Sequence, residues 1–322
     1  MRAMVLTAGL GTRLRPLTLE RAKPAIPLVG KPIIVRLIEK LAKEGVTEFR
    51  MNLHHLPASI TAIFDGPAYF KKYKVSFSWE PTILGTAGGL KANETFFYDQ
   101  TFLMVNGDIV FDFDLSKALE FHQSQRALAT MILRPQDRPY EFYPVFIDDQ
   151  GHLLHFKQSQ PSDKEIRQAY VFTGIHILEP EIFNYIPAGV FCEINDHVYP
   201  TVINQGGRVF GFAVEGYWND VGNPFRYLSA HRHLLNTNDS ARNFRDEVDV
   251  IIEKGARVEY GVWAETGCVF KFGSCAADCI FWENVILEKD VSLRGCIVGS
   301  NVIVKESQEN RIITRTGSYP IE

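Results

Sequence analysis

The C-terminal part of the sequence repeats an apolar or small residue at every sixth position, and this repeat restricts the fold most strongly. Two such columns run in parallel. One contains Trp263, Val269, Cys275, Phe281, Leu287 and Leu293, and the other contains Gly267, Gly273, Cys279, Val285, Val291, Ile297 and Ile303. A helix with 3.6 residues per turn cannot keep such a column on one face, whereas three short strands per triangular coil stack equivalent positions. The sequence therefore predicts a parallel β-helix of about two or three coils.

A β-helix of hexapeptide repeats is also the architecture of acyltransferases, which leaves a catalytic role open for this region. The run of repeats is short for an independent catalytic domain, so packing or assembly is the favoured role. Binding of acyl-CoA would distinguish a catalytic role of this region from a role in packing or assembly.

A polar stretch, Asn236 to Glu247, interrupts the apolar pattern before the repeats begin. It predicts a linker at 236–247 between a large domain at 1–235 and the β-helix at 248–322. The chain has 322 residues, 46% of them apolar, which is enough to bury a large core and a smaller second one.

Charge and hydropathy exclude several classes of partner. The net charge is −4 and the isoelectric point about 6.2, so there is no basic surplus for a nucleic-acid backbone. No apolar run approaches the roughly 20 residues of a membrane span. We therefore expect no nucleic-acid partner, no membrane contact and a cytoplasmic protein.

The cysteines do not form a metal-binding pattern. They are odd in number, and Cys275 and Cys279 are neither a Cys-x2-Cys pair nor followed by a histidine. Reduced thiols in a core are the expectation.

The first 80 residues alternate between strand and helix patterns. The expected strands are Ala3 to Ala8, Glu48 to His54 and Lys74 to Glu80, and the expected helices are Ile33 to Leu41 and Pro57 to Phe64. This order predicts an α/β fold with a mostly parallel, doubly wound sheet. Ligands of such sheets bind beyond the carboxyl ends of the strands, so the loops that follow the strands are the candidates for function.

The first such loop is suited to bind phosphate. Gly9 and Gly11 allow consecutive N–H groups to point into one concavity, Arg13 adds a planar set of donors, and Lys23 adds a point charge. The loop lacks the third glycine of a dinucleotide fingerprint and the Gly-Lys-Ser/Thr of a P-loop. An ordinary glycine turn with surface arginines is the alternative.

The whole string from Gly9 to Thr18, with Lys23-Pro24, resembles the signature of sugar-1-phosphate nucleotidylyltransferases. Members usually have two glycines where this chain has Ala8-Gly9. The resemblance implies a Rossmann-like nucleotide-diphospho-sugar transferase sheet followed by a left-handed parallel β-helix. It also implies nucleotide contacts from Leu6, Ala8, Gly9, Gly11, Thr12, Arg13 and Lys23.

The second loop, Glu80 to Gly89, is rich in small residues, which let a flat ring approach the backbone. In the family a segment like Leu84 to Gly88 lies against the nucleotide base. The resemblance therefore implies nucleotide contacts from Glu80, Gly85, Thr86 and Ala87. The alternative is a flexible turn that caps a helix beginning near Leu90.

The third loop follows an apolar strand that begins at Phe102 and leads to Asn106-Gly107-Asp108. The resemblance implies that Asp108 binds a metal ion and the sugar phosphate. The segment Tyr217 to Pro224 resembles the closing motif of the family, in which Asp220 is the second metal ligand. The implied ion is Mg²⁺. A turn or helix-capping role is the alternative for each aspartate.

The sugar side is expected to begin with a hairpin at Tyr140 to Lys157. Family members often have a Glu-Lys-Pro after the position of Phe156, but Gln158, Ser159 and Gln160 stand there. Lys157, one residue earlier, can take over the contact to the sugar phosphate only if the strand slips by one residue, which turns its side chain to the other face. A structural strand lysine is therefore the preferred interpretation, and Lys157 is kept as the candidate for the sugar phosphate. The resemblance further implies sugar contacts from Gly174 and Glu193, the latter competing with a solvated glutamate at a helix start.

The implied reaction joins an NTP and a sugar 1-phosphate to give an NDP-sugar and pyrophosphate, with Arg13, Lys23, Asp108 and Asp220 as the catalytic set. Among the branches of the family, the chain looks most like mannose-1-phosphate guanylyltransferases. Uridylyl or thymidylyl transfer to another sugar 1-phosphate stays open, as does a non-catalytic nucleotide-sugar sensor. A homodimer is a further expectation.

Overall fold

The computed structural model describes residues 1–65, 72–136, 141–156, 169–237 and 249–321. Contacts divide the chain into two compact units. The sheet unit comprises Met1–Leu10 and Arg36–Asp220, and the β-helix unit comprises Gly11–Val35 and Val221–Glu322. Among the described residues, none of the helices has both the length and the apolar character needed to cross a bilayer.

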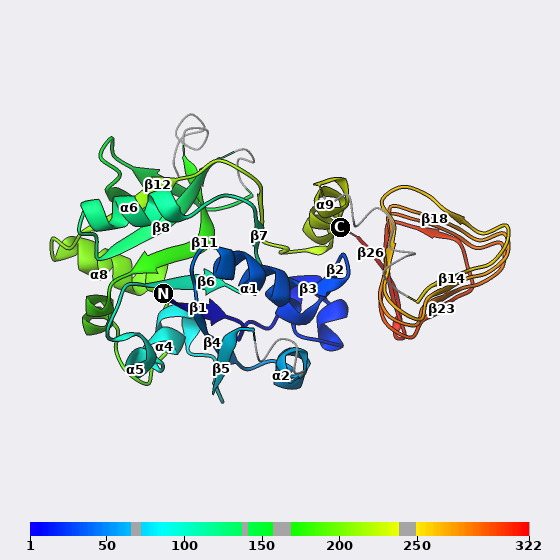
Figure 1. Ribbon diagram of the computed structural model, residues 1–322, viewed down its shortest axis with the longest axis horizontal. Helices are drawn as coiled ribbons and strands as arrows, with labels where there is room; N and C mark the ends of the chain where they lie inside the picture. The colour runs from blue at the N-terminus through cyan, green and yellow to red at the C-terminus, as the bar shows by residue number, and fades with distance from the viewer. Residues whose placement is uncertain (66–71, 137–140, 157–168, 238–248, 322) are drawn as a thin grey trace. The chain divides into compact units, whose positions relative to one another are not determined.

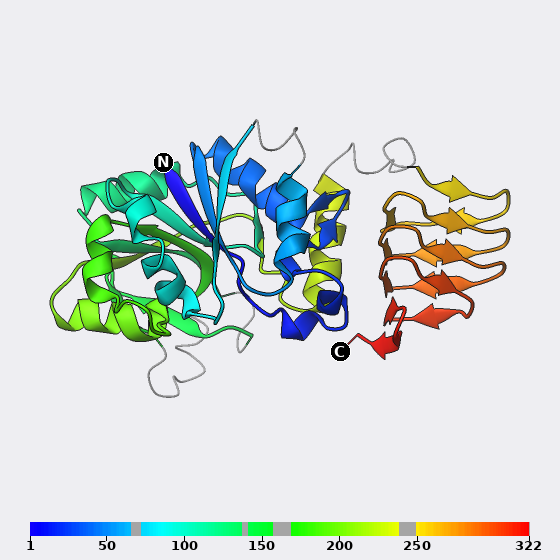
Figure 2. The ribbon, with the colours of Figure 1, turned by 90° about the horizontal axis from the view of Figure 1, so that it is seen from below.

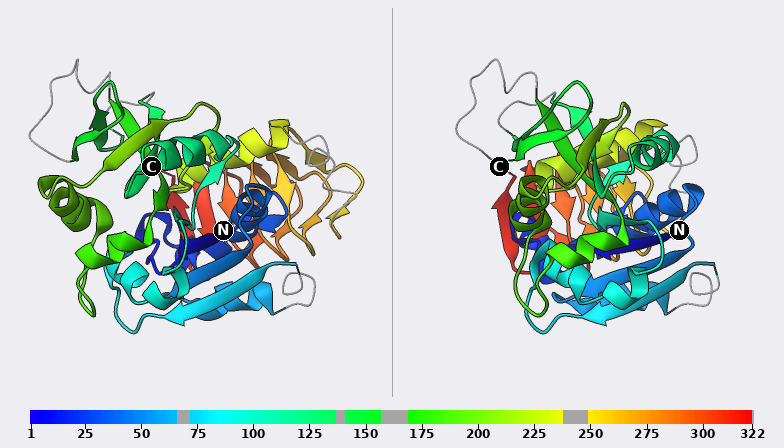
Figure 3. Two further views of the ribbon diagram at one scale, coloured as in Figure 1. Left: turned by 60° about the vertical axis from the view of Figure 1, so that its left-hand side comes forward. Right: turned by 90° about the vertical axis from the view of Figure 1, so that its left-hand side faces the viewer.

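The described residues of the sheet unit form a nine-stranded mixed sheet (Figures 1 and 3). Its main path runs β10-β9-β11-β6-β1-β4-β5, and β8 and β12 branch from β11. The strands are β1 Arg2–Leu6, β4 Glu48–Leu53, β5 Lys74–Trp79, β6 Phe102–Asn106, β8 Ala129–Pro135, β9 Pro144–Ile147, β10 Leu153–Phe156, β11 Tyr170–Leu178 and β12 Val209–Ala213. β6, β1, β4 and β5 are parallel, as predicted, and β11 is antiparallel to β6.

Helices connect these strands in the alternation expected from the sequence. They are α1 Ile33–Lys43, α2 Pro57–Phe64, α4 Gly85–Lys91, α5 Glu94–Phe97, α6 Ser116–Ser124 and α8 Tyr199–Asn204. The predicted strands and helices of the first 80 residues are confirmed, with ends that differ by one or two residues. The predicted hairpin is confirmed too, since β9 and β10 pair antiparallel and turn through Gly151, whose φ is +86°.

Two stretches deserve separate description. The chain that leads to Tyr217 leaves the sheet early, because β12 ends at Ala213 and Gly216 has a φ of +121°, which an extended strand does not contain. The expected loop before Leu90 is helical from Gly85, because neighbouring backbone and carboxylate groups accept the hydrogen bonds of its first N–H groups, as described below.

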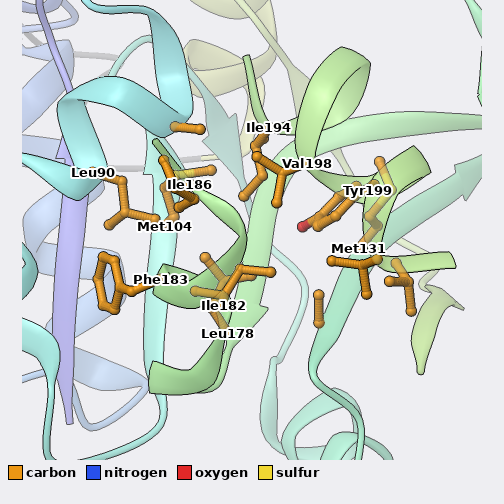
Figure 4. Close-up of a cluster of buried hydrophobic side chains, with 14 of the residues drawn as sticks. Leu90, Met104, Met131, Leu178, Ile182, Phe183, Ile186, Ile194, Val198 and Tyr199 are labelled. Atoms are coloured by element: carbon orange, nitrogen blue, oxygen red, sulfur yellow. The ribbon is translucent and has the colours of Figure 1, made fainter. Parts of the chain in front are cut away.

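A large apolar cluster fills the sheet unit beneath the helices (Figure 4). Met104 of β6 and Met131 of β8 meet Ile182 and Phe183 of the turn after β11, together with Tyr199 at the start of α8. All five side chains are at most 2% exposed. The core is therefore continuous from the parallel strands to the segment that carries Glu193.

The β-helix unit contains the coils predicted from the six-residue repeat (Figure 2). Three sheets stack the strands β14-β17-β20-β23, β15-β18-β21-β24 and β16-β19-β22-β25, and β26 pairs antiparallel to β25. These strands are β14 Ile251–Ile252, β15 Arg257–Val258, β16 Trp263–Ala264, β17 Val269–Phe270, β18 Cys275–Ala277, β19 Ile280–Phe281, β20 Ile286–Leu287, β21 Ser292–Arg294, β22 Ile297–Val298, β23 Ile303–Val304, β24 Gln308–Glu309, β25 Arg311–Thr314 and β26 Gly317–Pro320. Four levels are stacked, so the predicted two or three coils were too few.

The strict six-residue period was also wrong over the later coils. Val269 pairs with Ile286, and Ile286 with Ile303, so the full coil repeats after 17 residues and one of its three sides is a residue short. The residue that points into the core therefore lies one position earlier in the sequence than a strict six-residue period predicts. Ile303 is 52% exposed, whereas Val302 and Val304 are buried in the β-helix core.

The same unit contains α9, Pro224–Thr237, and the residues that follow the first glycine loop. Between Gly11 and Val35 lie three short 3-10 turns, at Thr12–Leu14, Leu17–Leu19 and Lys23–Ala25, and a hairpin of β2 Pro27–Leu28 and β3 Lys31–Pro32. The peptide bond Arg15–Pro16 is cis. Asn236, predicted as the start of the linker, is still helical, and residues 238–247 lie outside the described part of the chain.

Candidate functional site

Asp108 is placed at the carboxyl edge of the parallel strands by the end of β6. Leu6 of β1 pairs with Asn106, and the N–H of Gly107 donates to the carbonyl oxygen of Leu6 at 2.9 Å. A Cβ at Gly107 would lie 2.8 Å from that oxygen and 2.8 Å from Thr7 Cγ2. Only glycine fits this crossing, so the chain turns tightly and presents the half-buried Asp108 beside the start of the first glycine loop.

Asp220 is brought to the same place by a two-stranded antiparallel ribbon. β7, Val110–Phe111, pairs with β13, Trp218–Asn219, so that Val110 lies opposite Asn219. Asp220 directly follows Asn219 in this ribbon, and Asp108 lies two residues before Val110. The two aspartates, 112 positions apart, therefore sit at one end of one ribbon.

The alternative role of Asp220 as the cap of the following helix is not what the structure shows. Asn223 accepts the hydrogen bond from the N–H of Arg226 at 2.8 Å at the start of α9. Both aspartates are half-buried. No group of three or more His, Cys, Asp or Glu side chains suited to a metal occurs in the described ranges.

Gly174 lies in an irregular stretch of β11 against the end of β6. Its φ is +86°, the pairing of β11 with β8 shifts between Phe172 and His176, and a Cβ at Gly174 would lie 2.8 Å from Asn106 Nδ2. The indole N–H of Trp218 donates to the carbonyl oxygen of Thr173 at 2.7 Å. The ribbon that carries Asp220 is thereby fixed to the strand that carries Gly174.

A buried hydrogen-bond chain joins the carboxyl ends of β1, β4 and β5. The N–H of Thr7 donates to Asn52 Oδ1 at 2.9 Å, and Asn52 Nδ2 donates to Glu80 Oε1 at 2.8 Å. Glu80 Oε2 accepts from the N–H of Leu84 at 3.1 Å. Glu80 is only 2% exposed, and its carboxylate links Asn52 to the backbone of Leu84. This buried carboxylate does not support the expected role of Glu80 in nucleotide contact.

The first N–H groups of α4 are bonded to the segment before α8. Those of Ala87 and Gly88 donate to the carbonyl oxygen of Cys192, at 2.9 and 3.0 Å. Glu193 Oε2 accepts from the N–H of Thr86 at 3.2 Å and from its Oγ1 at 2.6 Å. Glu193, expected to contact the sugar, thus binds Thr86, expected to contact the base.

The glycines of α4 are required by this packing. A Cβ at Gly85, whose φ is +75°, would lie 2.6 Å from the carbonyl oxygen of Cys192, and one at Gly88 would lie 2.7 Å from that of Val190. Burial and the Glu193 carboxylate raise the pKa of the Cys192 thiol, so it stays protonated at neutral pH. Cys192 is therefore a packing residue.

Glu193 also lines a pocket of about 380 Å³. The pocket has an aromatic side and a polar side, and its lining residues are Phe142, Tyr143, Val171, Phe172, Glu193, Asn195 and Asp196. Phe142 packs against Trp218 of the ribbon, with ring centroids 5.1 Å apart. Asn195 Oδ1 is buried without a hydrogen-bond partner among the described residues. An aromatic wall facing amide and carboxylate groups suits a hydroxylated ring.

The remaining predicted nucleotide contacts lie on either side of the unit boundary. Ala8 is buried and Leu6 half-buried, and a Cβ at Gly9 would have no atom within 4 Å. In the β-helix unit, Thr12 and Arg13 are exposed.

Lys23 is 8% exposed, and its Cβ lies 3.3 Å from the Cβ position of Gly11. Lys157, like Gln158 to Gln160, lies outside the described residues.

Sequence reasoning missed the residues that hold this site. Asn52 and Trp218 are the clearest cases, since each makes a hydrogen bond to a residue more than 25 positions away. The one signal for Asn52 in the sequence is an amide between Met51 and Leu53 of β4, since a buried amide requires a hydrogen-bond partner.

Comparison with known proteins gives matches along most of the chain. A profile of the family described as nucleotidyl transferase matches residues 2–237. A UTP–glucose-1-phosphate uridylyltransferase from Synechocystis is 32% identical over 92% of this chain and 74% of its own length. A mannose-1-phosphate guanylyltransferase from Mycobacterium tuberculosis is 29% identical over 84% of this chain and 75% of its own length.

Solved structures share the fold. A UDP-glucose pyrophosphorylase from Acinetobacter baumanii has a TM-score of 0.64 at 17% identity and covers 76% of this chain and 97% of its own. HddC from Yersinia pseudotuberculosis has a TM-score of 0.63 at 24% identity and covers 72% and 99%. At these identities the likeness concerns the fold alone.

Proposed function

Since this chain belongs to the nucleotidyl transferase family, we propose that it transfers the nucleotidyl group of an NTP to a sugar 1-phosphate, giving an NDP-sugar and pyrophosphate. The observation that carries the proposal is the antiparallel pairing of β7 with β13, in which Val110 lies opposite Asn219, because Asp108 shortly precedes β7 and Asp220 directly follows β13. Curated relatives that catalyse transfers of this kind match over most of the chain.

The chemistry is a displacement at phosphorus. A phosphate oxygen of the sugar 1-phosphate attacks the α-phosphorus of the NTP in line, and the bond from that phosphorus to the bridging oxygen of the β-phosphate breaks. The bonding electron pair leaves with pyrophosphate. Because both reactants are anions, most of the catalysis lies in positioning and charge neutralisation. Arg13 and the glycine-loop amides steady the leaving pyrophosphate, and Lys23 contacts the reactant phosphates.

Asp108 and Asp220 fit a Mg²⁺ ion. Magnesium is commonly held by one or two carboxylates, with substrate phosphates and water completing its shell, and the described residues offer two carboxylates without further acidic or imidazole ligands. When bound, the ion reduces repulsion between the two phosphates. The chain's own contribution is to orient both carboxylates through the ribbon and through the turn at Gly107.

The pocket beside Glu193 is the proposed place for the sugar ring. Its aromatic wall can pack on the ring face, while Glu193 and Asn195 accept from hydroxyl groups. Gly174, which packs closely on the Asn106 side chain, is proposed for the sugar on the resemblance alone. Lys157, which directly precedes the residues aligned with the family's Glu-Lys-Pro, is the proposed substitute contact for the sugar phosphate.

GTP with mannose 1-phosphate is the first proposed substrate pair, and UTP with glucose 1-phosphate is the second. The first follows the sequence motifs, and the second follows the 32% identity to the Synechocystis uridylyltransferase. A panel of NTPs and sugar 1-phosphates with Mg²⁺, measured by pyrophosphate release, separates them. Release with one pair identifies the substrates, and no release across the panel would favour a nucleotide-sugar sensor and overturn the proposal.

Asp108→Asn tests the site itself. Loss of one metal-binding charge removes several kcal/mol of transition-state stabilisation, so turnover should fall by roughly three orders of magnitude. Asp149→Asn, in the exposed hairpin turn, is the matched control and should keep full activity. Near-normal turnover of folded Asp108→Asn protein would contradict the assignment.

A further inference from the structure

An arginine on the signature segment, Gly11–Val35, is bound to the β-helix through both terminal nitrogens of its guanidinium group. Arg21 Nη1 and Nη2 donate to the two carboxylate oxygens of Glu283, at 3.1 and 2.8 Å, and Nη2 also donates to Ser300 Oγ at 3.0 Å. The guanidinium lies over the Trp282 ring, 4.6 Å from its centroid. Such a bidentate, stacked pair fixes both the distance and the orientation of the arginine.

The ion pair persists at neutral pH. Burial by itself would raise the pKa of Glu283, but the hydrogen bonds from Arg21 and Ser300 outweigh it and hold the pKa below its ordinary value. Ser300 Oγ donates to Glu283 Oε2 at 2.6 Å. The carboxylate is therefore charged and fully bonded under ordinary conditions.

Two more contacts hold the segment downstream of Arg21. The hydroxyl of Tyr227 in α9 donates to the carbonyl oxygen of Pro27 and accepts from Trp282 Nε1, the latter at 3.1 Å. Glu265 Oε1 accepts from the N–H of Gly30 at 3.2 Å and from Trp263 Nε1 at 3.0 Å. The segment is thus fastened at three points along its length.

The anchored arginine lies between the two residues that close the glycine loop. Thr18 Oγ1 donates to the carbonyl oxygen of Gly11 at 2.9 Å, and a Cβ at Gly11 would meet Thr18 Cγ2 at 2.8 Å and Lys23 Cβ at 3.3 Å. The turns between them are 3-10 turns of three residues each, which have little stability of their own. Their conformation must come from what they are fastened to.

We propose that the β-helix positions the nucleotide-binding segment, and that Arg21 is the positioning residue through which it does so. This inference rests on the proposed function. Arg21 touches no reacting atom in it. Its contact with Glu283, Ser300 and Trp282 fixes Thr18 and Lys23, and these fix Gly11 and the exposed Arg13 before the triphosphate binds. A preordered loop loses less entropy on binding and holds the phosphates in reactive geometry.

The test compares Arg21→Gln with Arg232→Gln in the full-length protein. Arg232 also makes a two-pronged ion pair with the β-helix, donating to the Asp278 carboxylate at 2.7 and 2.5 Å, but it lies on α9 and not on the signature segment. Arg21→Gln should lower kcat/KM for the NTP about 100-fold, with KM raised as well as kcat lowered. Arg232→Gln should leave both within about two-fold of the wild type.

Two further measurements keep the outcome clear. Hydrogen–deuterium exchange should become faster across 11–23 in Arg21→Gln and not in Arg232→Gln. The exchanged pair Arg21→Glu with Glu283→Arg should recover at least a tenth of wild-type kcat/KM. Equal exchange of 11–23 in the two single variants, or normal kinetics in Arg21→Gln, would overturn the proposal.

Pyrophosphate release by the wild type separates this inference from the proposed function. If the wild type releases pyrophosphate and Arg21→Gln behaves like the wild type, only the positioning role fails. If the wild type is silent with every substrate pair, the proposed function fails, and exchange alone then decides whether Arg21 orders the segment.

Discussion

Two glycine-bearing segments follow strands of the sheet, and their glycines serve opposite purposes. After β1, a Cβ at Gly9 would meet no atom within 4 Å. After β5, a Cβ at Gly85 would lie 2.6 Å from the carbonyl oxygen of Cys192. The first glycine leaves a surface open, whereas the second allows one piece of backbone to pack directly on another.

The two segments also differ in their hydrogen bonds. At the start of α4 the N–H groups of Thr86, Ala87 and Gly88 already have acceptors, Glu193 and the Cys192 carbonyl. The Gly9 region is exposed, and the segment that follows is held by the side chain of Arg21. A glycine-rich string in a sequence therefore does not by itself indicate a ligand-binding backbone.

Gly85→Ala should produce the largest effect on the fold. The φ of +75° is unfavourable for alanine, and the new Cβ would overlap the Cys192 carbonyl oxygen, so the free energy of unfolding should fall by about 2–4 kcal/mol. Chemical denaturation measures the change. Gly45→Ala is the matched control, because its φ is +86° but its Cβ would meet nothing within 4 Å. Equal losses in the two variants would show that backbone strain, and not packing, explains Gly85.

Gly9→Ala should affect activity and leave the fold unchanged. Its Cβ enters open space, so the free energy of unfolding should stay within about 0.5 kcal/mol of the wild type. If phosphate approaches the backbone there, kcat/KM for the NTP should fall about 100-fold, since a displacement of about 1 Å has that effect. Unchanged kinetics would remove Gly9 from the nucleotide site and weaken the contrast with Gly85.

Thr86→Val should produce a smaller loss that is confined to the second segment. Its Oγ1 donates to Glu193 at 2.6 Å and accepts from the N–H of Ile194 at 2.9 Å. Without it the free energy of unfolding should fall by about 1–2 kcal/mol. Thr61→Val in α2, whose hydroxyl has one long contact of 3.5 Å, is the control for the loss of a hydroxyl. A loss no greater than that of Thr61→Val would mean that the link between Thr86 and Glu193 is weak.

As the pH falls, the sheet unit should lose stability before the ion pair between Arg21 and Glu283 is lost. Burial lowers the pKa of His176 to about 3, whereas the unfolded chain takes up that proton near pH 6.5. Between these values the unfolded state binds more protons, so stability falls with falling pH, by at most about 1.4 kcal/mol per pH unit. Glu283, with a lowered pKa, contributes its stability above the carboxyl range and loses it only below about pH 4.

Unfolding free energies measured from pH 7 to pH 5 check this prediction. The slope should flatten in His176→Gln and should be unchanged in Glu283→Gln. A slope that persists in His176→Gln would assign the acid sensitivity to another group.

Much of the fold could be predicted because its signals are local. The apolar run of β1, the alternation of β4 and the helical spacing of α1 depend on neighbours within a few positions, and the six-residue repeat indicated the β-helix. The repeat misplaced Ile303 because a 17-residue coil shortens one side by one residue, which depends on stacking between coils. Asp108 could be singled out only because Asn106-Gly107-Asp108 resembles the family's metal-binding motif, since a carboxylate after a strand is by itself more often a turn or cap residue.

The sequence by itself determined the kinds of element, their order and the chemistry available at the strand ends, since periodicity and side-chain type are properties of short stretches. Only the tertiary structure decided which of these groups remain available to a ligand. Glu80 is occupied by Asn52 and Leu84, Thr86 is bound by Glu193, and Arg21 is held by Glu283 from 262 positions away. Such partners leave no pattern along the chain, because hydrogen bonding and close packing depend on distance in space, which folding alone sets.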